Sequence, residues 1–155
     1  MHGPTAEHSL PGYFHRALGR AANRQGQQPH EATLWYLTDL PPRFAPSEAF
    51  FHPNSRRSGL KPLAMIYGEA ASAKSEAERH RLLQRLGDVA LFVAGLFHQS
   101  LERRAIGREY LVSMGGSAYS YLADNAPRDI SVFDELATRF VPFVNLLSDL
   151  IHANR

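Results

Sequence analysis

The sequence contains no cysteine among its 155 residues. Without thiols, the chain has no disulfide, no thiolate zinc site, no cysteine-ligated iron–sulfur cluster and no thiol nucleophile. It also lacks an apolar run of the roughly 18–20 residues that a membrane span needs. The N-terminal stretch from Met1 to His8 lacks the basic and apolar regions of a signal peptide. We therefore expect a cytoplasmic protein with no membrane span.

Net charge is almost absent as well. The 17 Lys and Arg residues oppose 15 Asp and Glu residues, which leaves +2, although the sequence pI is about 9.2. A surplus this small does not by itself predict nucleic-acid binding. Residues 79–108 hold six arginines against two acids, and residues 109–155 hold three arginines against six acids. Because these two segments can neutralise each other in a bundle, a nucleic-acid partner is not expected.

The apolar residues recur at helical spacing, and no segment shows the alternation of a half-buried strand. The chain is 44% hydrophobic and 21% charged, which is typical of a globular protein. We predict an all-α fold, a single-domain bundle over residues 1–155 with five or six helices around a buried central helix. The predicted helices cover residues 10–25, 30–40, 62–70, about 75–103, 107–124 and 131–151.

The central helix has the clearest signals. Ser75 and Glu78 match a capping box, in which a serine oxygen and a glutamate satisfy free amide donors at a helix start. From Val89 to Phe97 the sequence has no polar residue, and a helix that is apolar all round is buried on all sides. The spacing of Gly87 and Gly95 predicts the close approach of a neighbouring helix.

Proline and glycine mark the interruptions. Pro41-Pro42 should end a helix and open an irregular Pro-rich segment at about 41–61. Gly115-Gly116 should kink the helix over 107–124 or admit a crossing helix. Pro142 should bend the last helix near residues 138–142.

No catalytic or metal-binding motif is present, and we predict no catalytic residue, metal ligand or cofactor. The eight histidines include no pair at the i, i+4 spacing of a helical zinc motif. A His-Glu-x-x-His sequence and the Gly-x-Ser-x-Gly elbow of serine hydrolases are both missing.

Asp88 is the most informative polar residue, because it adjoins the apolar run. A carboxylate there is costly unless it is paired or hydrogen-bonded. In a structural interpretation an arginine of another helix, a tyrosine hydroxyl or backbone amides satisfy it. In a functional interpretation Asp88 binds a ligand or handles a proton. The candidate ligand-binding residues are Asp88, His98, Tyr110 and Tyr119.

A resemblance rests on Leu86-Gly87-Asp88 and the apolar residues up to Phe97, followed by Met114-Gly115-Gly116-Ser117-Ala118-Tyr119. These residues resemble a group of uncharacterised bacterial all-helical proteins, over roughly residues 75–150. Glu109-Tyr110 stands where that group would have two tyrosines. The resemblance implies a bacterial helical domain and no particular activity.

The leading functional hypothesis is a non-enzymatic helical protein-interaction or regulatory domain. Its partner is another protein or a second copy of the chain in a homodimer. Candidate partner-binding residues are Arg56 and Arg57 in the 41–61 segment, together with Arg103 and Arg104. An alternative is a small-ligand or cofactor-binding helical protein, with or without enzymatic activity, that has a pocket near Asp88 and His98. A third hypothesis is a nucleic-acid-binding regulator.

Overall fold

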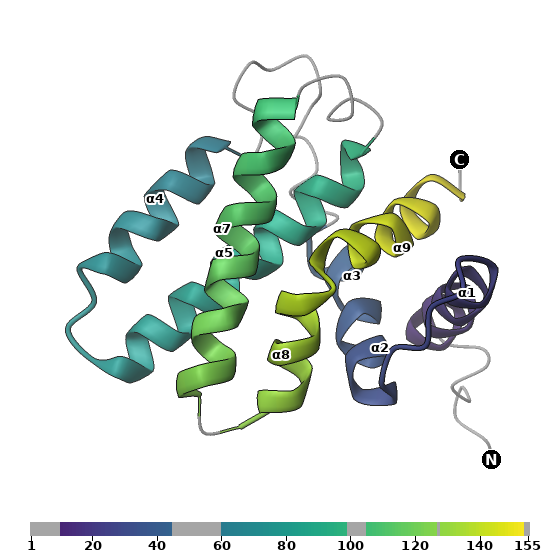
Figure 1. Cartoon of the computed structure of the whole chain (residues 1–155), viewed down its shortest axis with the longest axis horizontal. Coiled ribbons are helices and arrows are strands. Elements are labelled where there is room, and N and C mark those ends of the chain that lie inside the picture. Colours follow the sequence, from purple (N-terminus) through teal and green to yellow (C-terminus); the bar gives the residue numbers. More distant parts are fainter. Residues whose placement is uncertain (1–9, 45–59, 99–104, 127, 154–155) are drawn as a thin grey trace.

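The computed structural model describes residues 10–44, 60–98, 105–126 and 128–153. Within these ranges the chain is all-helical and has no strand (Figure 1). Seven helices have eight residues or more, and a further five-residue helical turn is α3. The elements are α1 (Leu10–Arg24), α2 (Glu31–Thr38), α3 (Leu40–Phe44), α4 (Leu60–Ala71), α5 (Glu76–Leu96), α7 (Ala105–Asn125), α8 (Ile130–Thr138) and α9 (Phe140–Ala153).

The all-α prediction is confirmed, but the predicted count of five or six helices is wrong. The expected last helix is two helices, α8 and α9, separated at Arg139, where φ is −119° and ψ is 33°. Pro142 explains the break, because it has no N–H to donate to the carbonyl of Thr138 in a continuous helix. Restarting the helix at Phe140 places Pro142 in the first turn, where the missing N–H costs nothing.

The tolerance of a helix for proline in its first turn also explains α3. Pro41 and Pro42 lie in its first turn, so Leu40–Phe44 is helical although we expected the irregular segment to begin at 41. Residues 45–59 of that segment lie outside the described residues, and α4 already begins at Leu60.

The buried face of α9 includes Phe143, Leu146 and Leu150. Apolar spacing over residues 131–151 predicts Val141 and Ile151 in the buried stripe, but both are half-buried. Phe143 lies seven residues after Leu136 and four before Leu147, so it shares the face of these core residues.

α5 is the buried central helix that the sequence predicts. The Ser75 Oγ accepts a hydrogen bond from the Glu78 amide at 3.1 Å and so caps the helix. Every residue from Leu86 to Leu96 is buried. The helix ends at Leu96 rather than near residue 103, since Phe97 departs from helical geometry with φ −107° and ψ 22°.

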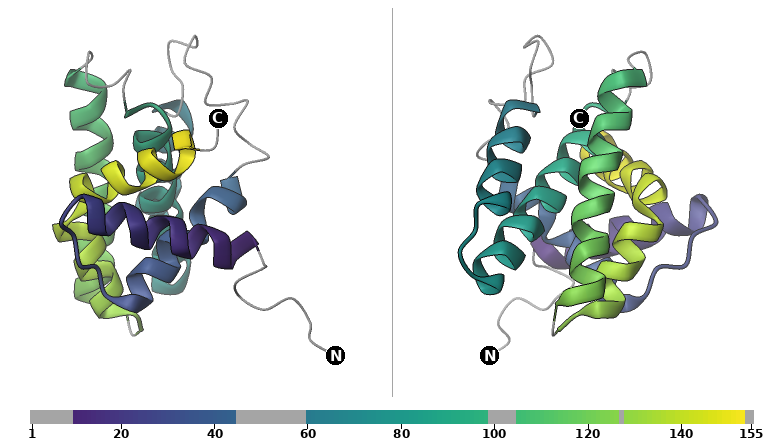
Figure 2. Two further views of the ribbon diagram at one scale, coloured as in Figure 1. Left: turned by 90° about the vertical axis from the view of Figure 1, so that its right-hand side faces the viewer. Right: turned by 60° about the vertical axis from the view of Figure 1, so that its left-hand side comes forward.

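Helices surround α5 in layers. α4, α7 and α9 pack against it, and α8 packs against α7. α1 packs against α9 and α2, so that α1 and α4 lie at opposite edges of the molecule (Figures 1 and 2). No described helix is long and apolar enough to cross a membrane.

The glycines of the core permit this close packing. A Cβ on Gly95 would lie 2.9 Å from the Leu147 Cβ of α9, and one on Gly115 would lie 2.5 Å from the Phe140 ring. The prediction that Gly115-Gly116 admits a crossing element is therefore confirmed at Gly115. Helix α7 continues through both glycines from Ala105 to Asn125.

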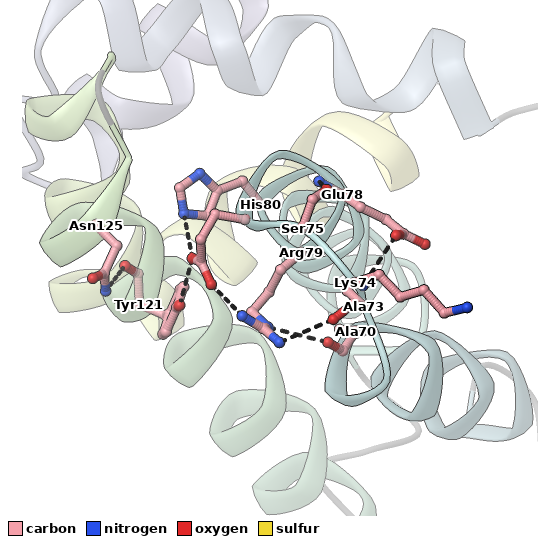
Figure 3. A network of polar contacts seen from close by, with 10 residues as sticks. Ala70, Ala73, Lys74, Ser75, Glu78, Arg79, His80, Tyr121 and Asn125 are labelled. Atoms are coloured by element: carbon pink, nitrogen blue, oxygen red, sulfur yellow. Dashed lines mark hydrogen bonds and ion pairs between the residues drawn. The ribbon is translucent and has the colours of Figure 1, made fainter.

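A surface network connects the start of α5 to the helices on each side (Figure 3). The Arg79 guanidinium donates to the carbonyl oxygens of Ala70 at 3.3 Å and Ala73 at 3.2 Å, and so satisfies the C-terminal end of α4. Tyr121 of α7 donates to the Glu76 carboxylate at 2.9 Å. This hydrogen bond is the main reason that the pKa of Glu76 lies below its ordinary value.

The expected pairing of the basic segment 79–108 with the acidic segment 109–155 does not occur in the described part of the chain. Arg79 forms its ion pair with Glu76 of its own helix. Arg81 and Arg85 are exposed, so water rather than the C-terminal acids solvates them.

Candidate functional site

Asp88 lies at the centre of the bundle and is 1% exposed. Its Oδ1 accepts hydrogen bonds from the hydroxyls of Tyr36 at 2.6 Å and Tyr119 at 2.7 Å. Its Oδ2 accepts from Nη1 of Arg43 at 2.9 Å. The three donors come from α2, α7 and α3, so one carboxylate on α5 joins four helical segments.

Burial is the dominant electrostatic effect here. It raises the pKa of Asp88 above its ordinary value, and the three donors limit the rise because they stabilise the ionised form. Burial also raises the pKa of Tyr36 and of Tyr119, and the neighbouring Asp88 charge adds to both shifts. The two hydroxyls therefore keep their protons and remain hydrogen-bond donors across the physiological range.

This geometry favours the structural interpretation of Asp88. Both carboxylate oxygens are occupied, and Tyr119 is fully buried. The predicted tyrosine–Asp88 hydrogen bond and the arginine partner are both confirmed. An acid that is 1% exposed and held by three protein donors fixes the relative positions of α2, α3, α5 and α7.

Sequence reasoning did not identify Tyr36 and Arg43. They precede Asp88 by 52 and 45 residues, and no local pattern connects them to it. Gln84, one helical turn before Asp88, also belongs to the network, because its side-chain amide donates to the Tyr36 hydroxyl at 3.0 Å. The sequence signal was the position of Asp88 beside the apolar run, which indicates that it needs hydrogen-bond partners but does not indicate which residues they are.

The other predicted site residues do not meet at Asp88. Tyr110 is half-buried and packs against the core. His98 lines a surface hollow of about 700 Å³ between α9, the end of α5 and the turn after α1. Neither Asp88 nor Tyr119 lines that hollow, so the hollow does not bring Asp88 and His98 together. Arg56, Arg57, Arg103 and Arg104 lie outside the described residues.

Metal-binding groups are not assembled in the described ranges, which contain no cluster of three or more histidine, aspartate or glutamate side chains able to hold a metal ion. Comparison with known proteins gives no match to a family model, a curated protein or a solved structure. The resemblance to a bacterial helical group therefore stays a prediction.

Proposed function

We propose that this chain is a non-enzymatic helical interaction domain that forms a homodimer through the outer face of α4. The observation that carries the proposal is the exposure of two large apolar side chains on this one helix. Met65 is 60% exposed and Tyr67 is 54% exposed. Large apolar side chains exposed on one helix are a feature of interaction sites.

The shape of α4 supports a helical partner. Its inner face buries Leu63, Ile66 and Ala70. The outer face carries a row of small residues, Ala64, Gly68 and Ala71, which are all exposed. These three positions follow the i, i+4, i+7 spacing of one helix face, and Met65 and Tyr67 flank the row. A Cβ on Gly68 would meet no atom within 4 Å, so the row is open to a partner.

A second copy of the chain fits this surface better than a charged partner. Between Leu63 and Ala73 the sequence has one charged residue, Glu69, so the face offers little to attract a nucleic acid or a charged peptide. Two copies related by a two-fold axis would present the same neutral face to each other. A large side chain of one copy can then lie over the small residues of the other. The net charge of +2 leaves little repulsion between copies.

The expected dimer is weak. A helix of 12 residues spans about 18 Å, which is short for the roughly 800 Å² that each partner buries in a standard interface. Sedimentation velocity should therefore give a mass that rises from monomer at low micromolar concentration to dimer at several hundred micromolar. Met65→Lys should keep the protein monomeric over this range, because it places a charge in the contact.

Ile130 provides a matched control. It is 51% exposed on α8, so Ile130→Lys makes the same change of charge away from α4 and should leave the dimer intact. A wild-type chain that stays monomeric throughout, or equal dissociation by both lysine variants, would overturn the proposal.

The absence of native cysteine permits a direct test of the geometry. Gly68→Cys introduces a single thiol at the centre of the face, and mild oxidation should give a covalent dimer. Gly116→Cys is the control, because its Cβ also meets no atom within 4 Å but lies on α7. Equal cross-linking of the two variants would indicate random collision rather than a dimer through α4.

A further inference from the structure

The chain carries all of its sulfur in methionine side chains, because it has three methionines and no cysteine. Met65 lies on the outer face of α4 and is 60% exposed. Met114 of α7 is half-buried and packs against the core, and Met1 lies outside the described residues. Of the two described methionines, Met65 is therefore the more accessible to a small oxidant in solution.

Met65 lies beside the open part of the α4 face. Gly68 follows it by three residues and the exposed Glu69 by four, so both lie one helical turn away on the same side of the helix. A Cβ on Gly68 would meet no atom within 4 Å. A second copy of the chain that packs over Gly68 would therefore cover the Met65 thioether with atoms of its own.

Oxidation changes what this side chain requires from its surroundings. Methionine sulfoxide is polar and chiral, whereas the thioether is flexible and apolar. In the monomer, water solvates the added oxygen. Under a partner that oxygen needs a hydrogen-bond donor, and the small residues Ala64, Gly68 and Ala71 have no side chain that can supply one. The sulfoxide therefore favours the monomer over the dimer.

We propose that Met65 is a reversible oxidation site that controls dimerisation through α4, an inference that rests on the proposed dimer. The oxidant is hydrogen peroxide. The thioether sulfur attacks one peroxide oxygen, an S–O bond forms as the O–O bond breaks, and water leaves, so that the sulfur loses two electrons and the peroxide gains them. A reductase reverses the step, because two thiols become a disulfide and the sulfoxide oxygen leaves as water. These thiols must come from another molecule, since this chain has no cysteine.

The same contact should protect Met65, because a covered thioether is inaccessible to peroxide. With peroxide in large excess, Met65 should be oxidised more slowly at several hundred micromolar protein, where the dimer dominates, than at low micromolar protein. Met114 should react at the same rate at both concentrations, and peptide mass spectrometry measures both rates in one sample. Equal rates for Met65 in a protein that sediments as a dimer would show that the contact leaves Met65 uncovered, and would overturn the inference.

The direct test compares the dimer before and after oxidation. Met114→Leu is a conservative core substitution that removes the other described sulfur. Hydrogen peroxide should raise the dissociation constant of this variant, measured by sedimentation velocity, by about tenfold, equivalent to about 1.4 kcal/mol. Reductases for both sulfoxide epimers, supplied with a dithiol, should restore the original value. The converse variant Met65→Leu should have a dissociation constant that peroxide does not change, because leucine has no sulfur.

The outcomes separate this inference from the proposed function. A dimer that survives complete oxidation of Met65, as measured by mass spectrometry, would overturn the inference and leave the proposed dimer intact. An equal rise in the dissociation constant of Met65→Leu would place the sensitive residue elsewhere and would also overturn the inference. A wild-type chain that stays monomeric before any treatment would overturn both proposals.

Discussion

The ring of Tyr119 occupies the space in which a side chain on Gly87 would stand. A Cβ on Gly87 would lie 2.6 Å from Cε1 of that ring. The hydroxyl of the same tyrosine donates a hydrogen bond to Asp88, the next residue along α5. The glycine thus lets α7 approach α5 closely enough for a fully buried hydroxyl to reach a buried carboxylate.

Gly87→Ala should destabilise the protein. The added methyl group would displace the Tyr119 ring, which is enclosed on all sides, and would disturb its hydrogen bond to Asp88. Overpacking a core typically costs about 1–3 kcal/mol, and we expect a loss of about 2 kcal/mol in urea unfolding. Gly19→Ala is the control, because nothing lies within 4 Å of its Cβ in α1. That variant should gain up to about 1 kcal/mol from helix propensity, and a similar gain for Gly87→Ala would contradict the model of close approach.

Tyr119→Phe should destabilise the protein by an amount that grows with pH. Burial raises the pKa of Asp88 in the folded state, so ionisation of Asp88 makes the folded protein less stable as pH rises through that pKa. The Tyr119 hydroxyl opposes this loss, since it stabilises the ionised form. A hydrogen bond to a charged group contributes about 1.5–3 kcal/mol, against about 0.5–1.5 kcal/mol for a neutral pair.

The measurement is the difference in unfolding free energy between wild type and Tyr119→Phe, from about pH 4, near the ordinary pKa of an aspartate, to about pH 8. Taking the difference cancels the titration of the other carboxylates. Tyr67→Phe, at an exposed tyrosine, should show no such trend at low micromolar concentration. A cost for Tyr119→Phe that is independent of pH would mean that Asp88 does not change its ionisation state in this range, and the prediction would be wrong.

Glu135→Ala should destabilise α2 and its attachment to α8. Glu135 is 6% exposed on α8, and its carboxylate accepts a hydrogen bond from the backbone amide of His30, the residue that caps α2, at 3.1 Å. A negative charge also interacts favourably with a helix N-terminus. We expect a loss of about 1–2 kcal/mol, with faster hydrogen exchange in α2. Asp134→Ala, at the exposed neighbouring acid, should change neither quantity. If both variants behave alike, Glu135 does not anchor α2.

The sequence predicted those parts of the fold that depend on local chemistry. The Ser75 cap, the buried run of α5 and the interruption near Pro142 all follow from short patterns, and the structure contains them. The burial of Phe143 also follows from local spacing, because it lies seven residues after Leu136 and four before Leu147.

The candidate sites were less predictable, because they depend on contacts between distant segments of the chain. The position of Asp88 beside the apolar run indicated that it needs hydrogen-bond partners, yet Tyr36 and Arg43 contact it from segments far away in the sequence. The outer face of α4 was not predicted either. Helical spacing identifies Leu63 and Ile66 as core residues, but it does not reveal that the opposite face is exposed among the described residues.

The packing of α1 against α9 affects how the chain folds while it is being synthesised. Arg24 of α1 and Asp149 of α9 form an ion pair across 125 residues of sequence, and the apolar face of α1, which includes Leu18, needs α9 as part of its cover. On the ribosome, α1 emerges long before α9 is synthesised. Leu18 therefore stays accessible to chaperones until α9 has left the exit tunnel, and only then can α9 cover this side of the core.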